Sequence, residues 1–93
     1  MKAILVSKEV KNTHLFVAVI QARDWYEPSQ RNRSPIMEDD FVVCTYYDFH
    51  DGFKSNIEGK TTIAICRDFD DAKTLLDSNF VKLINKYYRE KHR

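Results

Sequence analysis

"DDAKTLLDSNFVKLINKYYREKHR", residues 70–93, carries apolar side chains at the spacing of one face of an α-helix. Apolar residues recur three and four positions apart from Ala72 to Tyr88, and only Asn79 interrupts the series. An amphipathic ladder of this length without a break predicts one helix, not two. The stretch therefore predicts a single C-terminal helix that packs its apolar face on the rest of the chain.

The charges at the two ends of this stretch agree with the helix dipole. Asp70 is the predicted N-cap and Asp71 lies in the predicted first turn, whereas Lys and Arg side chains crowd the last turns. A helix of some twenty residues would be ~30 Å long at ~1.5 Å per residue. We therefore expect it to extend past any sheet of six- or seven-residue strands.

Four stretches before the helix have the composition of β-strands. They lie at residues 2–8, 14–23, 41–50 and 60–67. The second and third are apolar on both alternating tracks, which indicates central strands that are covered on both faces. Gly52 and Gly59 mark turns between the last two strands, which should form a hairpin, with a short extra strand at 53–57 as an option.

These elements predict an α+β fold for residues 1–93 as a single domain. It is a small antiparallel four-stranded sheet in β-β-long loop-β-β order, packed on one long C-terminal helix in two layers. One helix covers one face, yet the central strands are apolar on both. The second face must therefore meet either the long loop or another molecule, and we expect a homodimer through that face or through an edge strand.

Composition limits the function classes. Of 93 residues 43% are hydrophobic and 31% charged, which is typical of a globular protein, and a net charge of +1 gives no general attraction to nucleic acid or anionic lipid. Cys44 and Cys66 lack metal-binding spacing and should be reduced thiols. Two glycines cannot build a phosphate-binding loop, so no cofactor is expected. Without a membrane span or secretory leader, the sequence favours a cytoplasmic protein with no membrane partner.

The polar run "DWYEPSQRNRSPIMEDD", residues 24–40, is the most unusual feature of the chain. Unstructured connections beyond ~12–15 residues are mostly functional or disordered. Two prolines bracket an Arg-containing tip, and aromatic residues and Met flank it, which suits a protein interface. The residues predicted to bind a partner are Trp25, Tyr26, Arg31, Arg33 and Met37. An exposed hairpin tip whose Trp25 tucks over the core remains the alternative.

A small nucleic-acid-binding protein is the alternative function. Its candidate residues are Lys86, Tyr87, Arg89, Lys91 and Arg93 at the helix end, together with the loop arginines Arg31 and Arg33. Basic groups interleaved with stackable rings suit phosphates and bases. The opposing interpretation is that the basic residues merely complement the helix C-terminus while the tyrosines continue the core ladder.

Enzymatic activity is not expected, and no metal site is predicted. The least unlikely enzyme is a metal-dependent nuclease that uses His14 with Asp48, His50 and Asp51. The leading hypothesis is a non-enzymatic binding module that acts on a larger protein or complex. The strand order and small size are similar to those of many unrelated small folds, among them some phage-encoded inhibitors of bacterial defence, which implies an inhibitor or regulator of a host machine.

Overall fold

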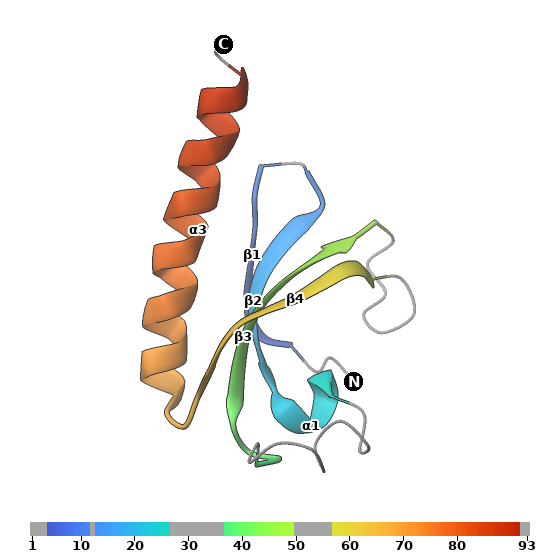
Figure 1. The fold of residues 1–93 in the computed structure, drawn as a ribbon, viewed down its shortest axis with the longest axis vertical. Coiled ribbons are helices and arrows are strands. Elements are labelled where there is room, and N and C mark those ends of the chain that lie inside the picture. The colour runs from blue at the N-terminus through green and yellow to red at the C-terminus, as the bar shows by residue number, and fades with distance from the viewer. Residues whose placement is uncertain (1–3, 12, 27–36, 50–56, 92–93) are drawn as a thin grey trace.

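The computed structural model describes residues 4–11, 13–26, 37–49 and 57–91. The elements follow in the order β1 (Ile4–Glu9), β2 (Leu15–Gln21), α1 (Ala22–Trp25), β3 (Phe41–Asp48), β4 (Ile57–Cys66) and α3 (Phe69–Lys91) (Figure 1). The four strands form one antiparallel sheet in the order β1-β2-β3-β4, packed against α3. This confirms the predicted α+β class. The extra strand considered at 53–57 lies, except for Ile57, outside the described residues.

The central strands are those that the two-sided apolar pattern predicts. β2 pairs with β3 in continuous register from Leu15 opposite Tyr47 to Gln21 opposite Phe41. Residues 17–20 of β2 are all fully buried, so both faces of this strand are covered. A strand of this kind has no solvent-facing track, which is why its sequence shows no polar alternation.

The second predicted strand is three residues too long, because it begins one residue too early and ends two residues too late. β2 ends at Gln21, and the chain continues into the helical turn α1, which is closed by a 2.9 Å hydrogen bond from the Tyr26 N–H to the Ala22 carbonyl. Gln21 is the last residue of β2 that pairs with β3, so the ladder ends there. The turn buries Ala22 and Trp25, and this tertiary packing prevails over the strand-like composition.

The predicted N-cap of the long helix is wrong. α3 begins at Phe69, so Asp70 lies inside the first turn together with Asp71. The Ala72 N–H donates to the Asp68 carbonyl at 3.2 Å. The ring centroids of Phe69 and Phe41 lie 5.6 Å apart, and this contact with the sheet accompanies a helix that begins two residues earlier than an N-cap at Asp70 would allow.

α3 covers one face of the sheet and is long enough to extend past it (Figure 1). Ala72 and Leu76 are fully buried there against the central strands. The core on this face is formed by Val17, Val19, Val43, Ala72 and Leu76, with Val6, Phe41, Ala64, Cys66, Phe69, Phe80 and Leu83 partly buried against it. An ion pair of 2.8 Å between Lys8 of β1 and Asp77 also joins the two layers.

The opposite face is closed by the chain itself. A second cluster of buried residues consists of Ala18, Ile20, Ala22, Trp25, Val42, Cys44 and Tyr46. Trp25 is only 3% exposed and Tyr46 only 1%. The face without the long helix is therefore not bare at these positions, which removes the main reason to expect a homodimer through it.

No helix among the described residues is both long enough and apolar enough to cross a membrane.

Candidate functional site

The two ends of the long polar segment meet beside the sheet. The Ala22 N–H donates to the Asp40 carbonyl at 2.9 Å, and the Arg23 N–H donates to the Glu38 carbonyl at 3.2 Å. We call residues 22–26 and 37–40 the loop base. These two bonds continue the pairing of the chain beyond the end of the β2–β3 ladder. The described residues on the two sides of 27–36, a segment outside the described residues, therefore meet at one place.

Side chains of the loop base strengthen this closure. Asp40 is 6% exposed, and its Oδ2 accepts a 2.9 Å hydrogen bond from the Met37 N–H, while its own N–H donates to the Met37 carbonyl at 3.0 Å. The guanidinium of Arg23 pairs with the Asp39 carboxylate, and Arg67 Nε lies 3.9 Å from Asp40 Oδ1. A buried carboxylate with such partners fixes the turn at 37–40.

Trp25 attaches the loop base to β4. Its indole Nε1–H donates to Thr62 Oγ1 at 3.0 Å, and the Tyr26 hydroxyl lies 3.2 Å from the same oxygen. The Lys60 ammonium donates to the Trp25 carbonyl and lies 4.3 Å from the centroid of the indole ring. Two successive aromatic residues are thus held by two residues of one strand, through hydrogen bonds and a cation–π contact.

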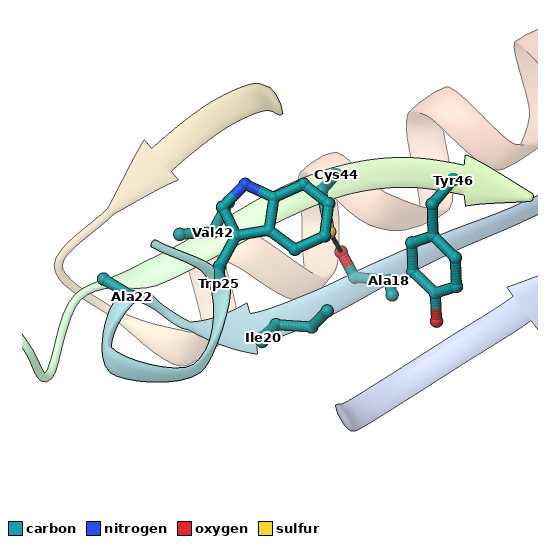
Figure 2. Packing of buried hydrophobic residues seen from close by; sticks show 7 residues of the cluster. All are labelled: Ala18, Ile20, Ala22, Trp25, Val42, Cys44 and Tyr46. Carbon is teal, nitrogen blue, oxygen red and sulfur yellow. Dashed lines mark hydrogen bonds between the residues drawn. The ribbon is translucent and has the colours of Figure 1, made fainter. Parts of the chain in front are cut away.

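The indole also closes the core beneath it. Figure 2 shows Trp25 and Tyr46 over β2 and β3, with their ring centroids 6.2 Å apart. Cys44 lies in this cluster, and its Sγ is 3.6 Å from the Ala18 carbonyl. Burial raises the pKa of the Cys44 thiol to about 12 and also raises the pKa of the Tyr46 hydroxyl. Neither group is ionised at neutral pH, so both act as packing residues.

The second cysteine is not activated either. Cys66 is partly buried at the end of β4, and both cysteines are free thiols, as predicted. Burial raises the pKa of the Cys66 thiol, and the carboxylates of Asp71 and Asp68 raise it further. A thiol reacts as its thiolate, so this environment disfavours a nucleophilic role.

The predicted partner-binding residues differ in their surroundings. Trp25 is buried and Tyr26 half-buried, so both face the domain, whereas Met37 is 57% exposed. Arg31 and Arg33 lie outside the described residues. The loop base thus holds Trp25 where an anchor would lie and leaves Met37 free to meet a partner, while partner binding by these residues stays a prediction.

The basic helix end is described only in part. Lys86 and Arg89 are exposed near the end of α3. The side chains of Tyr87 and Lys91, and all of Arg93, lie outside the described part. The opposite end of α3 carries Asp70 and Asp71, so the helix is charged in opposite senses at its two ends.

Of the nuclease candidates, the structure describes only His14 and Asp48, whose backbones are hydrogen-bonded to each other. Asp48 is 7% exposed, and its N–H donates to the His14 carbonyl at 2.9 Å, whereas His14 itself is exposed. His50 and Asp51 lie outside the described residues. Within the described ranges, no three His, Cys, Asp or Glu side chains are grouped as a metal site would need.

Sequence reasoning missed three residues that build the loop base. Thr62 and Lys60 form hydrogen bonds with Trp25, and Asp40 closes the turn at residues 37–40. An acid placed just before a strand is a common turn signal, so Asp40 could have been found. Nothing in the sequence distinguishes Thr62 from its neighbour Thr61.

Comparisons with protein families, curated proteins and solved structures find no match to this chain. Function must therefore be argued from the site itself.

Proposed function

We propose that the chain is a non-enzymatic binding module that acts by protein–protein interaction through its 24–40 segment. The observation that supports this most directly is the closed loop base. Backbone bonds between its two sides, the buried Asp40 and the anchored Trp25 hold both ends of residues 27–36 at one fixed place. A segment that served only as a connection would not need such a base.

The composition of the segment completes the argument. Arg31 and Arg33 can each make two parallel hydrogen bonds to a carboxylate of a partner. A segment whose ends are already fixed loses less conformational entropy on binding than a free chain does. Met37 adds exposed apolar area beside the loop base. Occupying a surface of a larger assembly in this way would inhibit or regulate it.

The test compares three tagged proteins in affinity purification from the native host. They are the wild type, the double variant Arg31→Ala/Arg33→Ala, and a charge-matched control, Lys73→Ala/Lys82→Ala, which removes two exposed basic residues of α3. We expect one partner protein to be retained by the wild type and by the control, and its affinity for the loop variant to fall more than about tenfold. The described core clusters consist of other residues, so the free energies of unfolding of all three proteins should agree within about 0.5 kcal/mol.

Two results would contradict the proposal. One is a partner that binds the loop variant as tightly as the wild type. The other is recovery of nucleic acid whose binding weakens steeply with salt, because counterion release marks phosphate contacts. That second result would favour the basic helix end as the binding site.

A further inference from the structure

Three exposed rings lie together at the end of the sheet far from the loop base. Tyr47 is 39% exposed and Phe49 45%, and their rings are nearly parallel, at 4°, with centroids 5.8 Å apart. The ring of His14, also exposed, lies 5.3 Å from that of Phe49. We call His14, Tyr47 and Phe49 the aromatic platform. Large rings exposed side by side are uncommon on a protein surface without a binding role.

The platform is the uncovered end of the helix-side face. Tyr47 pairs directly with Leu15, which shares its side of the sheet with Val17 of the helix-side core. Figure 1 shows the end of β3 and the start of β4 turning away from α3 at this point. The twist of the sheet therefore leaves these rings beyond the reach of the helix.

The backbone under the platform is held in an uncommon conformation. His14 has φ 62°, which L-residues rarely adopt. Its N–H donates to Glu9 Oε2 at 3.1 Å, and its carbonyl accepts from the Asp48 N–H at 2.9 Å. At Gly59, where φ is 61°, an added Cβ would lie 3.3 Å from the Tyr47 ring. Several contacts thus fix the rings in place, as expected of a built surface.

Carboxylates border the rings. Glu9 is exposed and bonded to the His14 N–H, and Glu58 is exposed on β4 in register with Tyr47. The other described charges nearby are the buried Asp48 and Lys11 in the β1–β2 turn. Among these described residues acidic groups outnumber basic ones, which disfavours phosphate and favours cations, for which ring faces have an additional affinity.

We propose that the aromatic platform binds an arginine-bearing basic segment of a partner protein. A guanidinium would stack on the exposed ring of Phe49 or Tyr47 and pair with Glu58 or Glu9. This surface is separate from the loop base, because β3 runs from Phe41 beside the loop base to Asp48 beside the platform, about 20 Å at ~3.3 Å per residue. The chain therefore has two binding surfaces at opposite ends of one strand.

The test is an NMR titration with a capped peptide of alternating Arg and Gly, read at the ring and amide signals. We expect the signals of Tyr47 and Phe49 to shift, and the dissociation constant to rise about fivefold in Phe49→Ala and also in Glu58→Gln. Ile65→Ala is the matched control, because Ile65 is 40% exposed elsewhere on the sheet, and it should bind like the wild type. A citrulline peptide, which keeps the shape and loses the charge, should not bind.

Unchanged affinity in both Phe49→Ala and Glu58→Gln would overturn the proposal. So would ring shifts caused by a single-stranded oligothymidine in place of the peptide, or ring shifts on concentrating the protein alone, which would assign the platform to a second copy. Amide spectra of the variants show whether they are folded. Arg31→Ala/Arg33→Ala should bind the peptide normally, so the platform and the loop can fail independently.

Discussion

At the scale of single residues, Trp25 joins parts of the chain that are distant in sequence. Its ring is buried against Tyr46. Its indole N–H donates a hydrogen bond to Thr62, which lies 37 positions further along the sequence. A buried indole needs a partner for its N–H, and a threonine on an adjacent strand provides one without burying a charge. Core closure and loop anchoring thus depend on the same side chain.

Trp25→Ala should lower the free energy of unfolding by about 3–5 kcal/mol, since it empties a buried site. Trp25→Phe keeps most of the volume and should cost less, because it loses mainly one hydrogen bond of about 0.5–1.5 kcal/mol. Urea unfolding followed by far-UV circular dichroism measures both, because the chain has one tryptophan and the variants lose its fluorescence. Leu5→Ala, at a 48% exposed position, is the control. A Trp25→Ala protein as stable as this control would show that the indole does not close the core.

A second prediction at this scale concerns the ion pair between the layers. The hydrogen bond from Lys8 lowers the pKa of the Asp77 carboxyl below its ordinary 3.8. A lowered folded-state pKa means that the stabilisation is present above 3.8 and is lost as the pH falls through the folded-state value. The wild type should therefore exceed Asp77→Asn in unfolding midpoint near neutral pH, and this difference should shrink as the pH is lowered below 3.8. If the difference in unfolding midpoint between the wild type and Asp77→Asn were the same near neutral pH and at low pH, this ion pair would not be its cause.

At the scale of elements, α3 supplies the helix-side layer of the core. Leu76 is fully buried, while Phe80 and Leu83 are only partly so, because the helix moves past the edge of the sheet towards its C-terminal end. The contribution of each apolar residue should therefore decrease along the helix.

Leu76→Ala should cost about 2–5 kcal/mol, a large share of the stability of a domain of this size. Leu83→Ala should cost less, and Val81→Ala, at a 56% exposed position, should stay within about 0.5 kcal/mol. Chemical unfolding of the three variants tests this order. Equal losses for Leu76→Ala and Val81→Ala would mean that the buried face of the helix has been assigned wrongly.

The elements also show what a sequence can predict. The helix ladder and the two-sided strands are local patterns, so the α+β class followed from them. The start of α3 was missed by two residues, and the residue at which it begins, Phe69, packs against Phe41, a contact distant in sequence. The turn α1 is too short to show any periodicity, and it exists because Trp25 reaches Thr62. The position of the His14 ring beside Phe49 depends on the positive φ of His14, and no pattern in the sequence predicts that φ.

At the scale of the whole molecule, both faces of the sheet are covered over its central strands by different parts of one chain. The edges are then the places left for self-association, and β4 is one of them. Its Ile63 and Ile65 are 37% and 40% exposed. An apolar edge strand is a ready template for pairing with another strand.

The homodimer stays a prediction, with β4 as its expected interface. Sedimentation equilibrium should then show a concentration-dependent dimer that Ile65→Lys converts to a monomer, because a charge at the edge opposes strand pairing. Phe49→Lys, at an exposed apolar position outside β4, should leave the dimer intact. If the wild type were a monomer at all concentrations measured, the prediction of a homodimer would be wrong.

The closed loop base has a consequence for how such a protein can change over time. The hydrogen bonds described between the two sides of the loop base are all made by residues outside 27–36. Doubling the length of a closed loop costs only about 0.6 kcal/mol. We therefore expect the sheet and helix to tolerate insertions and substitutions between the two sides of the loop base, so descendants of one ancestral chain could acquire new binding targets while the scaffold stays the same.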